Sequence, residues 1–202
     1  MTSTETGTGL VAQQLGAGIA AWVALAEQIG APAKRQAVEA AGQVVLDALR
    51  AGGTLLVAGN GGSAAIASHV AAEFLGKCIH DRHPLPAISL AESHSSLTAI
   101  GNDYGFDQVF LRGVQAFGRP GDVLLAMSTS GTSPNVVAAL AEARRRGVAT
   151  ILMTGAKGAG QGALADHLLV VPSSETPRIQ EVHMLWAHAW CEAVDLAMQD
   201  PS

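Results

Sequence analysis

Hydrophobic positions along the chain follow two periodicities, one typical of buried strands and one of helices. Short apolar runs rich in branched side chains predict five strands, each buried on both faces. These runs cover residues 54–58, 87–90, 123–127, 149–153 and 167–171. Between them, apolar residues recur every three or four positions, which predicts helices. Strands that alternate with helices are typical of an α/β fold, here a doubly wound parallel five-stranded sheet flanked by helices.

Two more helices are predicted ahead of the first strand. Helical spacing runs from Leu10 to about Ile29 and again from about Ala33 to Ala51, with a Gly-Ala-Pro break between them. The sequence assigns these helices no sheet face, so packing against the same pair in another subunit would bury them. The predicted organisation is an N-terminal helical segment for oligomerisation, residues 1–50, which starts with a polar, frayed stretch over residues 1–8, and one compact unit, residues 51–202.

Composition narrows the class of protein. With 49% hydrophobic and only 14% charged residues, the chain of 202 residues has a large core and little polar surface, which favours subunit interfaces. A net charge of −5 argues against nucleic acid or an anionic membrane as a partner. Cys78 and Cys191 are too far apart for a zinc motif and are expected to be reduced. The N-terminus lacks signal-peptide features and no run reaches 18 apolar residues, so we expect a soluble cytoplasmic protein.

The first predicted strand ends in a turn that suits an anion. Asn60, Gly61 and Gly62 follow Gly59, cannot continue a strand and favour a tight turn, and Ser63 is suited to the first turn of the helix behind it. Backbone N–H groups and the helix dipole converge at such a junction. The turn also fits G-x-G-x-x-A, the dinucleotide fingerprint, so a nicotinamide-dependent dehydrogenase is an alternative.

The helix after this turn carries candidate chemistry. His69 and Glu73 are four residues apart and therefore share one helix face. A histidine and a carboxylate at that spacing can bind one metal ion or share a proton transfer. Glu73 is roughly 15 Å along the axis from Ser63, so the pair could face the far end of a phosphorylated small molecule. The alternative is that His69 is an ordinary core or surface histidine.

A second polar loop and the last helix hold the remaining candidates. Residues 128–133, STSGTS, follow the third predicted strand and offer hydroxyl and N–H groups to a phosphate; alternatively they form a capped polar turn. Neither loop has the lysine of a P-loop, which argues against nucleotide triphosphate hydrolysis. The last helix contains Gln180, His183 and His188, and the spacing does not decide which histidine faces a ligand.

Taken together, several segments resemble the sugar isomerase (SIS) domain family, and most closely its phosphoheptose isomerases. They read GNGGSAAIASHVAAE, PLPAISL, LTAIGNDYGFDQVF, GRPGDVLLAMSTSGTSPNV and RIQEVHMLWAH, in order from about Ala51 to the last helix. The resemblance implies an aldose–ketose isomerase that interconverts sedoheptulose 7-phosphate and D-glycero-D-manno-heptose 7-phosphate. It also implies a homotetramer, and a sugar phosphate as the small-molecule partner.

The resemblance assigns site residues by position. It implies a zinc ion held by His69, Glu73, Gln180 and His188, and proton transfer by Glu73 and His188. The implied sugar phosphate site consists of Asn60, Gly61, Gly62, Ser63, Glu73, Asn102, Asp103, Ser128, Thr129, Ser130, Ser133 and Gln180. In the isomerisation, Glu73 would act as base and His188 as acid, while zinc would polarise the carbonyl.

The chain departs from the family pattern at three places. Ile66 stands where an aspartate is usual, residues 91–93 replace a frequent Thr-Thr-Asp, and Thr132 replaces an asparagine. The changes at 66 and at 91–93 could retune substrate choice, but none removes a metal or proton-transfer residue. A non-catalytic SIS-fold module that binds phosphosugar or protein is the alternative to an enzyme, and the four implied metal ligands count against it.

Overall fold

A computed structural model of the chain describes residues 9–199, so residues 1–8 and the last three residues of the predicted 51–202 unit lie outside it. The helices are α1 (Leu10–Ile29), α2 (Pro32–Arg50), α3 (Gly62–Leu75), α4 (His94–Tyr104), α5 (Val109–Phe117), α6 (Pro134–Arg145) and α7 (Thr176–Ala197). The strands are β1 (Leu55–Gly59), β2 (Ala87–Ser89), β3 (Val123–Ser128), β4 (Ala149–Thr154) and β5 (His167–Val170). Short 3₁₀ turns cover Phe106–Gln108, Ala156–Gly158 and Gly162–Leu164.

The five strands form one sheet in the order β2-β1-β3-β4-β5, and every adjacent pair is parallel. The predicted doubly wound α/β sheet is therefore confirmed. The chain winds one way from β1 to β2 and the other way from β3 to β5, so the strand order reverses between β1 and β3. Ligands in such sheets bind beyond the carboxyl ends of the strands at this reversal. The order also differs from the 3-2-1-4-5-6 order of the dinucleotide-binding fold.

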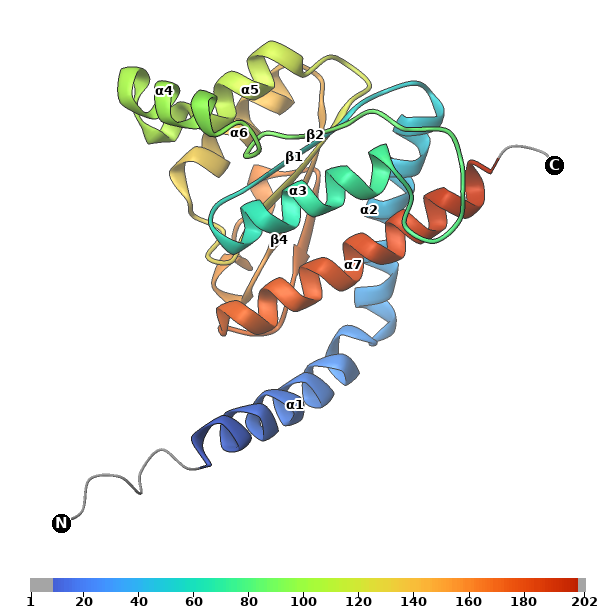
Figure 1. Cartoon of the computed structure of the whole chain (residues 1–202), viewed down its shortest axis with the longest axis vertical. Helices are drawn as coiled ribbons and strands as arrows, with labels where there is room; N and C mark the ends of the chain where they lie inside the picture. Colours follow the sequence, from blue (N-terminus) through green and yellow to red (C-terminus); the bar gives the residue numbers. More distant parts are fainter. Residues whose placement is uncertain (1–8, 200–202) are drawn as a thin grey trace.

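Helices cover both faces of the sheet (Figure 1). On one face α2, α3 and α7 pack over alternate strand residues such as Leu55, Val57 and Met127. On the other, α5 and α6 pack over the intervening residues, such as Leu56 and Ala126. Side chains alternate across a strand, so strands covered on both faces must be apolar throughout. This explains why the strands read as unbroken hydrophobic runs.

Two predicted boundaries differ in the structure. Asn102 and Asp103, predicted as a turn, lie in the last turn of α4, and the helix ends only at Gly105, whose φ of 94° places it in the left-handed region. The predicted helix over 106–117 begins as a 3₁₀ turn and becomes α-helical at Val109. In both places the glycine, which tolerates this backbone conformation, sets the boundary.

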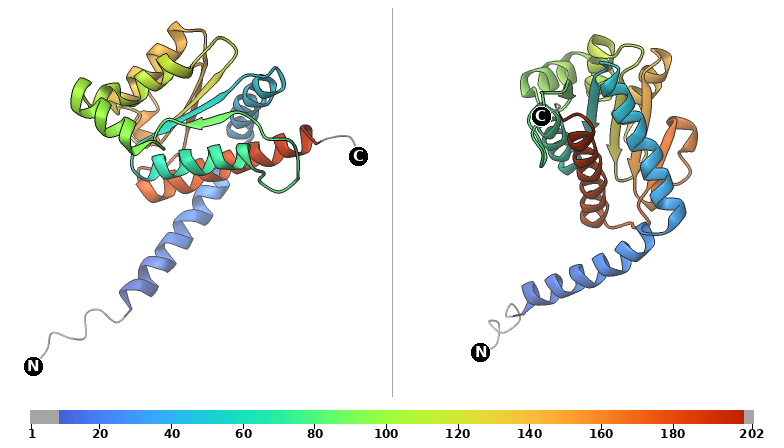
Figure 2. Two further views of the ribbon diagram at one scale, coloured as in Figure 1. Left: turned by 45° about the horizontal axis from the view of Figure 1, so that its top comes forward. Right: turned by 90° about the vertical axis from the view of Figure 1, so that its right-hand side faces the viewer.

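The two N-terminal helices behave differently from each other. α2 buries Ala41, Val45 and Leu49 in the core of its own chain, so it needs no second subunit for its apolar face. α1 projects away from the body of the molecule (Figure 2). Leu25 and Ile29 near its end are buried, but most of its other large apolar residues stay exposed, among them Val11 at 82% and Leu15 at 63%. Composition explains the difference, because α1 is apolar around most of its circumference, whereas α2 is clearly two-sided.

α1 is also, among residues 9–199, the one helix long and apolar enough to cross a membrane by length and composition. A single such helix near an N-terminus is weak evidence, since signal sequences and core helices pass the same test. The backbone carbonyl of Gly18 in α1 accepts a hydrogen bond from Arg178 of α7 at 2.8 Å. This contact joins α1 to the body of its own chain.

His183 is a fully buried polar residue in α7. Neither ring nitrogen has a hydrogen-bond partner within the described part of the chain. Burial lowers the pKa of His183 to about 4, because the charged imidazolium is poorly solvated there. The folded protein therefore holds this histidine uncharged at neutral pH.

We expect the free energy of unfolding to decrease as the pH falls from about 6.5 to about 4. In this window the unfolded chain binds a proton at His183 and the folded chain does not. The contribution of the uncharged His183 to the free energy of unfolding is therefore fully present above the pKa of the unfolded state and is lost as the pH falls toward the pKa of the folded state. The loss is up to about 1.4 kcal/mol per pH unit. Urea unfolding across this pH range measures the slope. His183→Gln should flatten it, His94→Gln on exposed α4 should not, and an unchanged slope in His183→Gln would contradict the assignment.

Candidate active site

The loops after β1 and β3 lie side by side at the point where the strand order reverses. Gly59 at the end of β1 is paired in register with Met127 of β3. Beyond these residues, the amide side chains of Asn60 and Asn135 exchange two hydrogen bonds of 2.9 and 2.8 Å. Asn135 is 1% exposed and is the second residue of α6, after Pro134. The reciprocal amide pair therefore joins the predicted glycine turn to the predicted serine loop.

The glycine turn brings backbone very close to its neighbours. Gly61 precedes α3 with φ of 55°, a left-handed conformation that favours glycine. A Cβ at Gly62 would lie 2.5 Å from the Gln180 amide of α7, so a larger residue there would displace that side chain. Ser63 is buried in the first turn of α3 and caps no backbone group with its side chain. The N-terminus of α3 thus faces the carboxyl edge of the sheet, where an anion is favoured.

The serine loop gathers several hydroxyl groups over a small region. The Ser128 hydroxyl lies 3.0 Å from that of Ser133 and 3.4 Å from that of Ser130. The backbone N–H of Gly131 donates to the Ser128 hydroxyl at 3.2 Å. Thr129 belongs to the same loop, and its carbonyl accepts from the N–H of Gly155 at 3.2 Å. Hydroxyl groups gathered next to a helix N-terminus are well suited to a phosphate.

His69, Glu73 and His188 meet on the facing sides of α3 and α7. The Nε2 atoms of His69 and His188 are 2.9 Å apart. The Nε2 atom of His69 is 3.4 Å from Oε1 of Glu73. Of the two histidines of α7, the structure brings His188 next to His69, whereas His183 is fully buried. Two imidazoles and a carboxylate at these distances can share protons or bind a metal ion.

Cys78 also lies beside Glu73. Burial, followed by a hydrogen bond to the Glu73 carboxylate, raises the pKa of the Cys78 thiol to about 11. The thiol is therefore protonated at neutral pH. A protonated thiol can donate to the carboxylate and orient it. Sequence reasoning treats Cys78 only as a reduced core residue, because the intervening turn that returns it to α3 leaves no sequence signal.

Gln180, Asn102 and Asp103 lie apart from the histidine cluster. Gln180 packs against Gly62, two turns of α3 before His69. Asn102 donates to the carboxylate of Asp103 at 2.7 Å, and within residues 9–199 no side-chain hydrogen bond of either residue reaches the glycine or serine loop. Asp103 instead lines a separate cavity of about 700 Å³ between α4 and α5. Within one subunit, the predicted substrate residues thus fall into two regions.

Ile66 and the base of α1 border the site. A hollow of about 550 Å³ is lined by Trp22, Gly62, Ile66, Gln180 and Met184, among others. Ile66, one of the departures from the family pattern, presents an apolar surface there and is 7% exposed. The N-terminal helix is therefore next to the glycine turn, although the two are far apart in the sequence.

Sequence reasoning missed three residues that hold this region together. Asn135 is hydrogen-bonded to Asn60, as described above. Arg82 forms an ion pair with Asp195 of α7. Asn135 lies two residues after the serine loop, so its position near a candidate loop could have suggested a role. Arg82 and Asp195 are separated by more than a hundred residues, and no spacing rule connects them.

Comparisons with known proteins agree with this arrangement. Residues 19–155 match the SIS domain family. The phosphoheptose isomerase of Bradyrhizobium sp. (strain ORS 278) is 54% identical over 157 residues, which cover 77% of this chain and 79% of that relative. The structure of the phosphoheptose isomerase GmhA from Neisseria gonorrhoeae superimposes with a TM-score of 0.83 at 39% identity, covering 92% of this chain and 99% of that one. The phosphoheptose isomerase from Francisella tularensis gives a TM-score of 0.85 at 33% identity, covering 92% and 98%.

A parallel sheet in this order, with paired glycine and serine loops at the strand reversal, defines a SIS domain protein. The chain belongs to that family, and within it to the phosphoheptose isomerases. It is therefore an enzyme with sugar-phosphate isomerase activity rather than a non-catalytic binding module.

Proposed function

We propose that the enzyme interconverts sedoheptulose 7-phosphate and D-glycero-D-manno-heptose 7-phosphate. The proposal rests on two features of one helix, α3: an N-terminus beside loops suited to a phosphate, and a histidine–glutamate pair farther along. The N-terminus of α3 lies at the phosphate-type loops, and His69 and Glu73, which contact or approach His188, lie farther along the same helix. From Ser63 to Glu73 the helix rises roughly 15 Å. This separation suits a long sugar whose phosphate and reacting carbons are at opposite ends.

Aldose–ketose isomerisation moves a proton between neighbouring carbons through an enediol. It needs a base at the carbon, an acid at the oxygen, and a fixed phosphate that orients the chain. Glu73 is our candidate base and His188 the acid, with the roles reversed in the opposite direction. Glu73 is half-buried and His188 is held by contact with His69, so both groups have restricted positions. The serine loop and the glycine turn would bind the phosphate.

The donor atoms also fit a zinc ion. Two imidazole nitrogens and one carboxylate oxygen are common zinc ligands, and they lie close together here. Among residues 9–199 no three His, Cys, Asp or Glu side chains form a ready metal cluster, so the ligands would adjust on binding. We propose His69, Glu73 and His188 as ligands. Gln180, the fourth ligand that the family resemblance implies, packs against Gly62 in the single chain, so its amide would have to move to reach the ion. Bound zinc would act as a Lewis acid that polarises the substrate carbonyl.

Glu73→Gln should abolish turnover while sugar phosphate binding survives. Glutamine keeps the shape of the side chain but cannot accept the proton, and loss of a positioned base typically reduces the rate by about 10²–10⁴-fold. Isomerisation kinetics and calorimetric binding of sedoheptulose 7-phosphate measure the two effects. Glu192→Gln, at an exposed position of α7 four residues beyond His188, is the matched control and should keep near-normal turnover. Near-normal turnover in Glu73→Gln would identify another group as the base.

We expect one zinc ion per active site. Metal analysis of the protein as isolated and after zinc reconstitution measures the stoichiometry, and His69→Ala should reduce it because one strong nitrogen ligand is lost. His94→Ala on α4 serves as the control histidine and should bind as the unaltered protein does. Full activity without metal in either preparation is incompatible with the zinc proposal.

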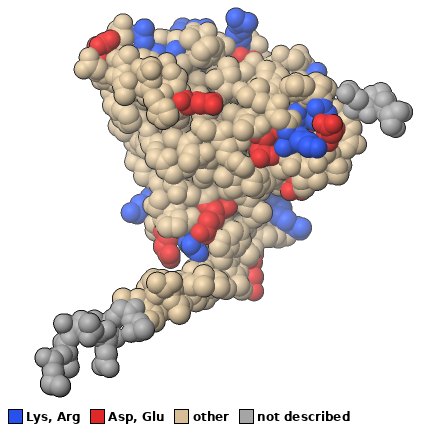
Figure 3. Space-filling view, in the orientation of Figure 1, with Lys and Arg blue, Asp and Glu red and all other residues tan. Residues whose placement is uncertain are grey.

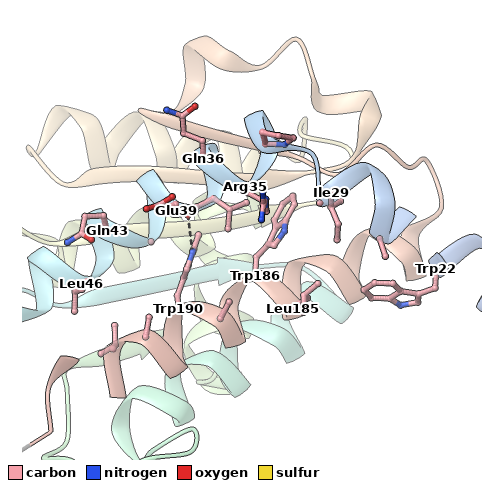
Figure 4. A pocket seen from close by; sticks show the side chains of 18 residues that line it. Trp22, Ile29, Arg35, Gln36, Glu39, Gln43, Leu46, Leu185, Trp186 and Trp190 are labelled. Atoms are coloured by element: carbon pink, nitrogen blue, oxygen red, sulfur yellow. Dashed lines mark hydrogen bonds between the residues drawn. The ribbon is translucent and has the colours of Figure 1, made fainter. Parts of the chain in front are cut away.

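We also propose a homotetramer in the cytoplasm, in which α1 packs against other subunits. Figure 3 shows α1 almost free of charged side chains, and its sequence has Glu27 as the only one. Next to its base, a groove of about 870 Å³ runs between α2 and α7 (Figure 4). Trp186 and Trp190 line it, and Trp190 donates to the carbonyl of Val38 at 3.0 Å. An exposed apolar helix beside an apolar groove favours burial by further copies of the chain.

The choice of four subunits rests on the family resemblance. The cytoplasmic location rests on the two free cysteines, which are typical of a reducing compartment. Because α1 adjoins the hollow at Gln180, assembly would place a subunit contact close to the active site.

Replacing Leu15 and Ile19 by glutamate should dissociate the tetramer. Both side chains are more than half exposed in the single chain, and buried charges without partners would oppose assembly. Light scattering at micromolar concentration measures the mass, and Gln13→Glu on the same helix is the control. A fully active monomer would contradict the proposed assembly. Binding of the unaltered protein to lipid vesicles through α1 would point to a membrane as the partner of this helix.

A further inference from the structure

Arg82 and Asp195 form an ion pair in which neither side chain exposes any surface. The Nε atom of Arg82 is 3.0 Å from Oδ1 of Asp195. Buried ion pairs are retained only when further hydrogen bonds satisfy their remaining atoms. In this pair, those further bonds all go to backbone groups around the proposed catalytic helix.

Arg82 satisfies the carboxyl end of α3. Its guanidinium donates to the carbonyl of Glu73 at 3.0 Å and to that of Phe74 at 2.9 Å. These carbonyls lie in the last turn of α3 and have no partner within the helix. Further bonds reach the carbonyls of Gly76 at 3.1 Å and His83 at 3.0 Å. The backbone of the proposed base is thus fixed directly by Arg82.

Asp195 holds the loop that follows α3. Its Oδ2 atom accepts from the backbone N–H groups of Cys78, Ile79 and His80 at 2.9, 2.7 and 3.1 Å. Cys78 is the residue whose thiol faces the Glu73 carboxylate. Asp195 itself lies in α7, seven residues after His188. Seven residues are close to two helical turns, so both side chains lie on the side of α7 toward α3.

We propose that the Arg82–Asp195 pair is a positioning device for the active site, which sets the placement of Glu73 and His69 on α3 relative to His188 on α7. The two helices come from distant parts of the chain, and the pair connects them close to the reacting groups. This inference rests on the proposed roles of Glu73 and His188. Neither Arg82 nor Asp195 contacts the substrate region, so both act through other residues.

The position of the pair predicts which kinetic constant changes. The pair acts at the carboxyl end of α3, whereas the phosphate loops lie at its N-terminus, next to the Asn60–Asn135 contact. Loss of the pair should therefore disturb proton transfer and metal binding but leave binding of the substrate phosphate unchanged. A merely structural role would lower stability without separating kcat from KM.

Arg82→Lys and Asp195→Asn test the proposal in the full-length protein. Lysine keeps the charge but not the planar set of donors, and asparagine keeps the shape but not the charge. We expect kcat to fall by about 10–100-fold, and the affinity for zinc, measured by chelator competition, to fall by a similar factor. KM for sedoheptulose 7-phosphate should stay within about twofold. Hydrogen exchange at the amides of Cys78, Ile79 and His80 should accelerate in Asp195→Asn.

Asp122→Asn is the matched control. Asp122 is a buried aspartate that accepts backbone N–H groups from Thr54 at 2.7 Å and Arg119 at 2.8 Å. It lies at the amino ends of β1 and β3, the sheet edge opposite the site. Its replacement should lower the unfolding temperature but leave kcat and zinc affinity unchanged.

Three results would overturn the proposal. The first is unchanged kcat and zinc affinity in both variants with accelerated exchange at the three amides. The second is an equal loss in Asp122→Asn. The third is failure of both variants to fold at low temperature while Asp122→Asn folds, which would make the pair a folding requirement only. An inactive and zinc-free unaltered protein would instead refute the proposed function, so the two failures are distinguishable.

Discussion

The packing of α3 against α7 over one face of the sheet is the contact on which the active site depends. Each helix contributes part of the candidate site: His69 and Glu73 come from α3 and His188 from α7. The helices are joined by shared core residues such as Val70 and Ala187, and by polar contacts at both ends of α3. Gln180 covers Gly62 at one end, and Arg82 joins the other end to α7. Such close packing transmits small displacements, so the spacing of the reacting groups depends on many residues that do not react.

A second constraint is the parallel sheet itself. All strands end at one edge, so the reversal of order between β1 and β3 leaves two loops next to each other without a helix crossing between them. The Asn60–Asn135 pair fills this position with hydrogen bonds that satisfy both amides. The fold therefore separates two regions suited to different tasks: backbone dipoles converge at the loops, which favours an anion, and the side chains of His69, Glu73 and His188 gather farther along α3, where they suit proton transfer.

The low fraction of charged residues in the chain is most evident in α1. Most of the hydrophobic residues are accounted for by strands covered on both faces and by the helices that cover them. The excess lies on α1 and along the groove beside α2, where it is exposed in the single chain. Because Arg178 binds the carbonyl of Gly18, this surface starts at the edge of the active site. An assembly that buries this surface, as proposed above, would bring a subunit contact close to the candidate site.

The sequence by itself determined the strands, the α/β class and the composition of both loops. These features depend on local properties: branched apolar runs, glycine turns and helical periodicity are readable within about ten residues. The spacing of His69 and Glu73 likewise follows from one helix. The resemblance to the SIS family implied His188 over His183, which spacing had left open, and in the structure His188 lies beside His69.

Tertiary structure alone decided which distant groups meet. The orientation of α7 about its axis, the return of Cys78 to Glu73 and the partnership of Arg82 with Asp195 each depend on contacts across long stretches of chain. The same holds for the different packing of the first two helices, since α2 packs on the sheet of its own chain and most of α1 does not. Periodicity shows that a helix has an apolar side, but only the packed structure determines which surface that side covers, because burial is a property of the whole fold.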